Sequence, residues 1–448
     1  MLYDLEELVL TRYCRRNVSA GAKLNVQNNI ANTVQRSRAD SAGTNSRRGL
    51  FRVRVAQVSP LAEAVPPRLY GGTERVVSWL SEALVLAGHD VTLFASGDSL
   101  TMAKLEPMVP KALRLANVRD HVPSTLLMLD EVRRRADEFD IIHFHVDILP
   151  FPLFEALAHK CVMTLHGRLD LAEAHPVYER FASIPLVSIS AAQRRPMPEG
   201  VNWLATIHHG LPANLYKPGA GAGGYLLFLG RIAPEKRPDR AIEIATRANI
   251  PLKIAAKVDA ADEEYFKEKI APLLGNPLVE FVGEVNDTQK QDLLGNALAL
   301  LFPIDWPEPF GLVMIEALAT GTPVIAWPQG AAPEVLDDDC TGMLVRTIDE
   351  AVSAAKAIRR LDRRQIRGIF ERRFTSERMA DGYVDAYRRM IVRHAVCQPS
   401  LVPLEPMSTP LLAPPIVSLE TNGRRADDTD EPPLEDDARD HGRWKKTS

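Results

Sequence analysis

Short apolar runs alternate with longer amphipathic segments in the first half of the chain, from Phe51 onward. The segments near 74–87 and 124–139 repeat their apolar positions with a helical period. Six runs are typical of buried strands: 51–59, 91–96, 141–145, 161–166, 186–190 and 203–209. Strands that alternate with helices in this way predict βαβ units and a parallel sheet.

A second series with the same rhythm follows a break in the pattern. The segment 211–224 carries two prolines and four glycines, which indicates a boundary between domains. Gly219, Gly221 and Gly224 spell GxGxxG, but they precede their strand, whereas a dinucleotide fingerprint follows one, so a linker is favoured. Six further strand-like runs come next: 225–230, 251–256, 278–283, 298–303, 323–327 and 342–345. The fold class is therefore α/β, with two Rossmann-like doubly wound domains facing each other across a cleft.

The chain turns helical after Asp349. Its last helical segment, 376–395, places Met379, Tyr383, Tyr387 and Ile391 on one stripe, which is expected to pack against a core. Arginine pairs in this region are interpreted as a solvated face rather than a nucleic-acid surface. The predicted divisions are an extension (1–50), two domains (51–212 and 213–375), a final helix (376–395) and a disordered tail (396–448).

Composition narrows the class of protein without identifying it. The 448 residues carry a formal net charge of −4, which gives no bulk electrostatic reason to expect nucleic acid as a partner. The four cysteines form no CxxC pair, so neither a zinc site nor a disulfide framework is expected. No apolar stretch is long enough to span a bilayer, and the first fifty residues lack a secretory pattern. A cytoplasmic enzyme with peripheral membrane contact at most is the expectation.

Polar side chains at the carboxyl ends of the predicted strands are expected at one edge of the first sheet. His143, His145 and Asp147 alternate along an extended segment, as metal ligands do, or they are polar residues lining a cleft. Nothing nearby completes a ligand set, and no metal is expected. His166 ends the next strand and is either a structural histidine or a donor to, or acceptor from, a sugar hydroxyl.

Two glutamates, Glu308 and Glu316, stand eight positions apart where a predicted strand gives way to a loop and a helix. Free backbone N–H groups at such a helix start attract an anion, most often a phosphate. Arg231 and Lys236 follow an earlier strand of the same predicted sheet and suit a diphosphate. Because parallel strands end at one edge, these four groups are expected to converge. Two carboxylates together also suggest an acid and base pair.

Gly71 and Gly72 precede a predicted helix in the first domain. Residues without Cβ let a ligand approach the backbone at a helix N-terminus, although a plain turn explains the pair equally well.

Taken together, these motifs resemble the retaining glycosyltransferases of family four. The match is carried by GGTE at Gly71, HG at His166, GRIAPEK at Gly230 and the E-x7-E of EPFGLVMIE, and it covers about 51–395. The resemblance implies the GT-B architecture, with the last helix crossing back onto the first domain. It makes the first domain the acceptor side and the second domain the donor side. Arg237 departs from the family pattern, where glycine is common.

The resemblance also implies roles for residues of the second domain. Arg231 and Lys236 would hold the donor diphosphate, Glu308 would contact the transferred sugar, and Glu316 would bind the ribose hydroxyls. A phosphate would meet the backbone of three consecutive residues, Phe310, Gly311 and Leu312.

From the first domain, His166 would face the donor sugar, and Gly71 and Gly72 would meet the diphosphate. The implied activity is metal-independent hexosyl transfer, with retained anomeric configuration, from a nucleotide diphosphate sugar to a carbohydrate, lipid-linked or small-molecule acceptor. UDP-glucose is the first donor to consider, and no cofactor is expected beyond this co-substrate. A GT-B-like epimerase and a non-catalytic sugar-nucleotide-binding module are the alternatives.

Overall fold

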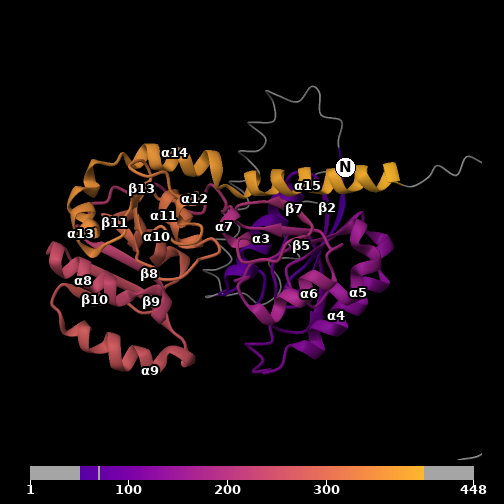
Figure 1. Cartoon of the computed structure of the whole chain (residues 1–448), viewed down its shortest axis with the longest axis horizontal. Coiled ribbons are helices and arrows are strands. Elements are labelled where there is room, and N and C mark those ends of the chain that lie inside the picture. Colours follow the sequence, from indigo (N-terminus) through magenta and orange to yellow (C-terminus); the bar gives the residue numbers. More distant parts are fainter. Residues whose placement is uncertain (1–50, 69–70, 398–448) are drawn as a thin grey trace, which may run out of the picture. The chain divides into compact units, whose positions relative to one another are not determined.

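The computed structural model describes residues 51–68 and 71–397 and contains two parallel β-sheets (Figure 1). The predicted N-terminal extension and all but the first two residues of the predicted tail lie outside these ranges. Both sheets belong to one compact unit that ends at Gln398.

The first sheet has seven strands in the order β3-β2-β1-β4-β5-β6-β7. They are β1 (Arg54–Val58), β2 (Asp90–Ser96), β3 (Lys104–Val109), β4 (Ile141–Phe144), β5 (Cys161–Thr164), β6 (Leu186–Ser188) and β7 (Trp203–Thr206). The pattern predicted six of them. It missed β3, whose sequence KLEPMV has no buried residue and includes a proline, as is typical of an edge strand.

The second sheet has six strands in the order β10-β9-β8-β11-β12-β13, and the sequence predicted all of them. They are β8 (Leu226–Ile232), β9 (Leu252–Val258), β10 (Val279–Phe281), β11 (Ala299–Phe302), β12 (Val324–Ala326) and β13 (Gly342–Leu344). Strand β11 is buried along its whole length, because helices cover both faces of a parallel sheet.

Helices connect the strands of each sheet. In the first half they are α3 (Gly72–Leu86), α4 (Val122–Arg134), α5 (Phe151–Phe154), α6 (His175–Arg180) and α7 (Ala191–Arg194). In the second half they are α8 (Pro238–Ala248), α9 (Glu263–Tyr265), α10 (Asp287–Asn296), α11 (Leu312–Ala319), α12 (Ala332–Val335), α13 (Ile348–Ala357), α14 (Arg363–Arg373) and α15 (Ser376–Cys397).

Each sheet reverses its direction of growth once. The reversal falls between β1 and β4 in the first sheet and between β8 and β11 in the second. A ligand crevice forms at such a switch point, outside the carboxyl ends of the strands. The predicted fold class, two Rossmann-like doubly wound sheets, is confirmed.

Helix α15 follows the second sheet in sequence but packs on the first, as the yellow ribbon in Figure 1 shows. Its Tyr383 and Tyr387 are fully buried, and their hydroxyls lie 2.9 Å from Thr164 Oγ1 and 2.8 Å from His143 Nδ1. The predicted apolar stripe is thus a packing face, and the predicted return of the last helix is confirmed.

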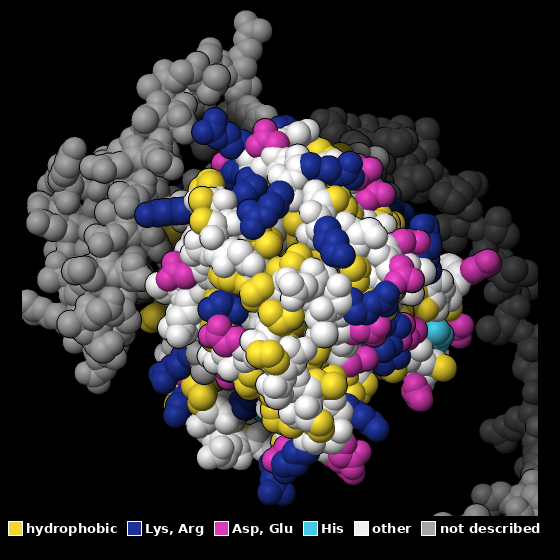
Figure 2. All heavy atoms as spheres, turned by 90° about the vertical axis from the view of Figure 1, so that its left-hand side faces the viewer, with side chains coloured by type: hydrophobic (Ala, Val, Ile, Leu, Met, Phe, Trp, Pro, Cys, Tyr) yellow, Lys and Arg dark blue, Asp and Glu magenta, His cyan; other side chains and the backbone are white. Residues whose placement is uncertain are grey.

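The outer face of the second half carries both charges, with basic side chains most numerous in its upper part (Figure 2). Two arginines of the second half pair with nearby carboxylates: Arg360 with Asp339 and Arg373 with Asp337. Arg363 is not part of a solvated face: it points inward and donates to the carbonyls of Gly219, Gly295 and Ala297. In the described part of the chain, no helix has the length and apolar character needed to cross a membrane.

Candidate functional site

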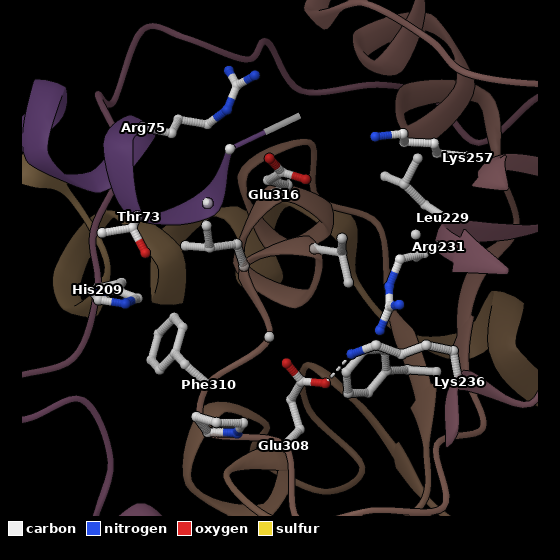
Figure 3. Close-up of a pocket in the computed structure, with 18 of the residues that line it drawn as sticks. Thr73, Arg75, His209, Leu229, Arg231, Lys236, Lys257, Glu308, Phe310 and Glu316 are labelled. Atoms are coloured by element: carbon white, nitrogen blue, oxygen red, sulfur yellow. Dashed lines mark hydrogen bonds and ion pairs between the residues drawn. The ribbon is translucent and has the colours of Figure 1, made fainter. Parts of the chain in front are cut away.

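A pocket of about 600 Å³ lies at the carboxyl ends of the strands and is lined from both sheets (Figure 3). The ten residues to which the family resemblance gave a role all line it. They are Gly71, Gly72, His166, Arg231, Lys236, Glu308, Phe310, Gly311, Leu312 and Glu316. In Figure 3 the side chains of Arg75 and Glu316 lie toward one end, and those of Lys236 and Glu308 toward the other.

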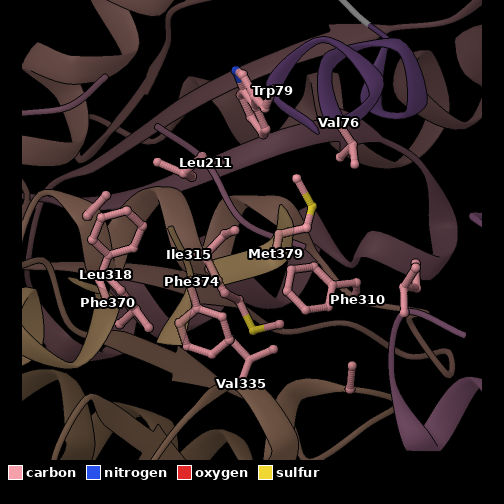
Figure 4. Packing of buried hydrophobic residues seen from close by; sticks show 14 of the residues in the cluster. Val76, Trp79, Leu211, Phe310, Ile315, Leu318, Val335, Phe370, Phe374 and Met379 are labelled. Atoms are coloured by element: carbon pink, nitrogen blue, oxygen red, sulfur yellow. The ribbon is translucent and has the colours of Figure 1, made fainter. Parts of the chain in front are cut away.

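Helix α11 begins at the middle of the pocket, directly after Gly311. This residue has φ 81°, and a Cβ there would lie 2.9 Å from Met314 Cε and 3.0 Å from Phe302 Cζ, so the turn requires glycine. Phe310 and Ile315 anchor the turn in a buried cluster that also contains Phe374 (Figure 4). The first N–H groups of α11 are therefore held rigidly at the pocket, where they favour an anion.

Helix α3 presents a second N-terminus to the same space. A Cβ on Gly72 would lie 3.8 Å from Leu312 Cδ1, so the first turns of α3 and α11 are neighbours. At Gly71 a Cβ would meet the Pro67 side chain at 2.8 Å, so no larger residue fits there. Two helix N-termini that converge on one point form a stronger anion site than either does alone.

Lys236 and Glu308 form an ion pair inside the pocket. The indole Nε1 of Trp306 also donates to Glu308 Oε2, at 2.9 Å, and the Lys236 ammonium lies 4.8 Å from the centre of the indole ring. Lys236 sits in the short 3-10 turn Pro234–Lys236, just before α8 rather than at its first residue. The pair places one cation and one carboxylate at the same end of the pocket.

Arg231 lies within β8, near its end, and two carboxylates orient its guanidinium. It donates to Asp262 Oδ2 and to Glu235 Oε1, both at 2.7 Å. Arg237, the departure from the family pattern, has the left-handed backbone conformation that favours glycine, with φ 54°. Its guanidinium pairs with Asp239 and Asp305.

Glu316 is the most deeply buried carboxylate of the site, with 3% of its side chain exposed. Its Oε1 accepts from Lys290 Nζ at 2.8 Å, whereas Oε2 has no partner within the described residues. Arg75 and Asp287 form an ion pair nearby, at 2.8 Å. Sequence reasoning missed Arg75, Asp287 and Lys290, because no motif marks them and α3 and α10 are far from Glu316 in sequence.

The first sheet contributes two stacked imidazoles, His166 and His209, whose ring centres are 5.2 Å apart. Both rings line the pocket, and the Nδ1 atom of each is buried without a hydrogen-bond partner in the described chain. Burial lowers the pKa of His166 to about 3 and lowers the pKa of His209, so both rings are neutral. Sequence reasoning did not select His209, although its place at the end of a predicted strand was a usable signal.

His143 and His145 do not line the pocket, contrary to the cleft-lining interpretation. His143 is fully buried beneath α15, and His145 lies behind His166. Among residues 51–68 and 71–397, no group of three or more His, Cys, Asp or Glu side chains is arranged to hold a metal ion.

The charge of the pocket differs in sign from that of the chain. Seven lysines and arginines line it against four glutamates, although the whole chain has a formal net charge of −4. Burial also raises the pKa of Glu74, one of the four. Opposite charge attracts a ligand into a cleft, so the pocket is suited to a polyanion.

The two halves of the site are linked beside Glu308. Ser190 Oγ donates to the Pro309 carbonyl at 2.7 Å, and the carboxylate of Glu334 accepts from the backbone N–H groups of Ala191 and Ala192. These bonds join the start of α7, in the first half, to the loop and helix that follow β11 and β12.

Two family models match the chain, one on each half. Residues 70–204 match Glycosyltransferase Family 4, and residues 220–376 match Glycosyl transferases group 1. The chain is 27% identical over 354 residues to a phosphatidyl-myo-inositol mannosyltransferase of Mycolicibacterium smegmatis, covering 73% of this chain and 89% of the relative.

Solved glycosyltransferase structures share the fold. Sucrose-phosphate synthase from Thermosynechococcus elongatus superposes with a TM-score of 0.63 at 18% identity, covering 76% of this chain and 100% of that one. AviGT4, a glycosyltransferase involved in avilamycin A biosynthesis, gives 0.58 at 23% identity, covering 76% and 98%. The two family matches follow one another in the order of the two sheets, and with the shared fold they identify this chain as a glycosyltransferase of the GT-B architecture.

Proposed function

We propose that the chain transfers a hexosyl group from a nucleoside diphosphate sugar, with retention of anomeric configuration. The observation that carries this proposal is that Glu308 and Glu316 each pair with their own lysine. Lys236 pairs with Glu308 at one end, Lys290 pairs with Glu316 at the other, and two helix N-termini meet between them. A donor has the matching order of groups: a sugar, a diphosphate and a ribose.

Each part of the donor then has a chemically suitable partner. The diphosphate lies at the starts of α3 and α11 with Arg231 and Lys236, the ribose hydroxyls donate to Glu316, and sugar hydroxyls meet Glu308 and His166. The two carboxylates lie at opposite ends of the pocket, and each pairs with its own lysine, so they suit two separate sets of hydroxyl donors better than they suit one acid and base pair.

The transfer itself is assigned to the donor diphosphate and the groups around it. The bond from the anomeric carbon to the β-phosphate oxygen breaks, and the acceptor oxygen forms its bond on the same face of the sugar. The acceptor proton passes to the departing phosphate oxygen. Preorganised cations and backbone N–H groups stabilise the charge that gathers on the diphosphate, which is the largest catalytic contribution expected here. The step as written needs no metal.

The acceptor is proposed at the level of class, as a carbohydrate, lipid-linked or small polyol hydroxyl. One relative, which covers 73% of this chain, is a phosphatidyl-myo-inositol mannosyltransferase, so inositol and inositol lipids belong in the first acceptor panel. Nucleoside diphosphate mannose donors belong beside UDP-glucose in the donor panel for the same reason.

The test is incubation of the purified full chain with the donor panel, with and without acceptors, reading products by mass and anomeric configuration by NMR. We expect a glycosylated acceptor with the configuration of the donor. An altered sugar without acceptor would establish an epimerase instead, and binding without nucleotide release would establish a binding module.

Glu308→Gln and Lys236→Met are expected to lose transfer by at least about 100-fold, as removal of a group that acts on transition-state charge does. The control is Glu280→Gln, which alters a glutamate of β10 that pairs with Lys253 outside the pocket. Full activity in either pocket variant would contradict the site.

A further inference from the structure

A chain of buried hydrogen bonds runs from helix α15 to the pocket. Tyr387 Oη lies 2.8 Å from His143 Nδ1 and 3.4 Å from the side-chain nitrogen of Gln57. The side-chain oxygen of Gln57 lies 2.8 Å from His145 Nε2, and His145 Nδ1 lies 2.8 Å from His166 Nε2. This series of hydrogen bonds ends at His166 Nδ1, which lies at the pocket without a partner in the described residues.

The direction of each bond follows from the Gln57 amide. Its oxygen can only accept, so the Nε2 atom of His145 carries the hydrogen. Burial lowers the pKa of His145 well below its usual value, so the ring has one N–H and its Nδ1 is bare. A bare Nδ1 must accept, which places the hydrogen of His166 on Nε2. The remaining nitrogen, His166 Nδ1, therefore presents a lone pair to the pocket.

We propose that Gln57, acting through His145, is a positioning residue that holds His166 in the tautomer whose Nδ1 accepts a hydrogen bond from a hydroxyl of the donor sugar. The inference rests on the proposed function for the identity of the ligand, but the tautomer itself is a property of the free protein. Tyr387 fixes the far end of this series of hydrogen bonds. Helix α15 therefore helps to set which ring nitrogen of His166 carries the hydrogen, although the helix does not touch the pocket.

The tautomer of His166 determines which group of a ligand its Nδ1 atom can bind. A lone pair on His166 Nδ1 accepts from a hydroxyl and cannot pair with a carbonyl or ether oxygen. The opposite tautomer would present an N–H at the same place, which donates to a hydroxyl, carbonyl or ether oxygen alike, so this selectivity would be lost. Because imidazole tautomers differ little in intrinsic stability, the Gln57 oxygen decides between them.

The direct test is the tautomeric state of His166 in the free enzyme. Long-range ¹H–¹⁵N correlation spectra of the full chain with labelled histidine report which ring nitrogen carries hydrogen, and the His166 signals are assigned from their loss in His166→Gln. We expect Nε2–H with a bare Nδ1 near neutral pH. A hydrogen on Nδ1, which a reversed Gln57 amide would produce, overturns the proposal.

Gln57→Leu tests the mechanism of control. In this variant His145 Nε2 has no acceptor, so His145 is expected to move its hydrogen to Nδ1 and donate to His166 Nε2. The unpaired N–H is then on His166, at the pocket where a ligand oxygen can accept from it, rather than beside the leucine. His166 would then carry hydrogen on Nδ1. The matched control is Tyr383→Phe, which removes a buried hydroxyl from the same helix but touches Thr164 rather than Gln57. An unchanged His166 tautomer in a folded Gln57→Leu variant contradicts the proposal, as does a change in the control.

The functional readout is a panel of donors that each carry fluorine, which can accept but cannot donate a hydrogen bond, in place of one sugar hydroxyl. In the wild type, one analogue should lose about 2- to 12-fold in kcat/KM, the usual effect of one neutral hydrogen bond. In Gln57→Leu the same analogue should lose less activity relative to its parent donor, because an N–H on His166 Nδ1 donates to the hydroxyl oxygen and to the fluorine. Equal discrimination in both proteins contradicts the role of Gln57, whereas failure of every donor with the wild type contradicts the proposed function and leaves the tautomer result standing.

Discussion

Glu316→Gln is the substitution that separates donor binding from folding most clearly. The proposed role of Glu316 is to accept ribose hydroxyls at its Oε2 atom, which is buried and has no partner in the described residues. Its other oxygen keeps an acceptor for Lys290 in the variant, because the glutamine carbonyl can take its place. The change therefore removes charge from the ribose contact without removing an atom.

The magnitude follows from the kind of bond that is lost. A hydrogen bond to a charged group contributes about 1.5–3 kcal/mol, and 1.4 kcal/mol corresponds to a factor of ten in affinity. The dissociation constant of the nucleoside diphosphate should therefore rise by about 10- to 150-fold. Burial favours the upper part of this range, since only 3% of the side chain is exposed and water cannot replace the lost contact.

Isothermal titration with UDP, GDP and ADP measures this change, using whichever nucleotide binds the wild type most tightly. Urea unfolding of the same samples reports stability separately. Glu280→Gln serves as the control, because the Glu280 side chain is 61% exposed and lies on β10 outside the pocket. The affinity of this variant for the nucleotide should stay within about twofold of the wild type. An affinity of Glu316→Gln within threefold of the wild type would refute the assignment of the ribose to this residue.

Two further predictions concern stability. Arg363→Met should lower the free energy of unfolding by about 3 kcal/mol in urea titrations, because it leaves buried carbonyls without a donor; a loss below about 1 kcal/mol would contradict this. Burial lowers the pKa of His143, His145, His166 and His209 far below the usual value of a histidine, so the unfolded chain binds more protons than the folded one below about pH 6.5. Stability should therefore fall, as the pH is lowered through this range, by up to about 1.4 kcal/mol per histidine per pH unit. Urea titrations at several pH values between 7.5 and 5 measure this loss of stability. A free energy of unfolding that does not change over this range would contradict the lowered pKa values of His143, His145, His166 and His209.

The sequence predicted the sheets well because their strands are buried on both faces. A run such as Ala299–Phe302 has no polar position, and it can be recognised without knowledge of its neighbours. Strand β3 could not be recognised in this way, since an edge strand with exposed charges has the composition of a loop. The convergence of Arg231 with Glu308 was also predictable, because strand ends of one parallel sheet meet at one edge.

The partners inside the pocket could not be predicted from the sequence. The pairing of Lys290 with Glu316 depends on where α10 lies beside α11, and α10 is a polar helix whose pattern does not indicate its packing face. The hydrogen bonds of Gln57 join residues 86 and 330 positions away, and no local spacing encodes such a contact. The pattern thus located the site, whereas the tertiary packing determined which group each charge faces.

The order of the donor along the pocket is the central claim, and a crystal structure with a bound nucleoside diphosphate sugar tests it most directly. We predict ribose hydroxyls on Glu316, the diphosphate between the starts of α3 and α11 with Arg231 and Lys236, and the sugar against Glu308 and His166. A donor bound in the reverse order, or outside this pocket, would contradict the account.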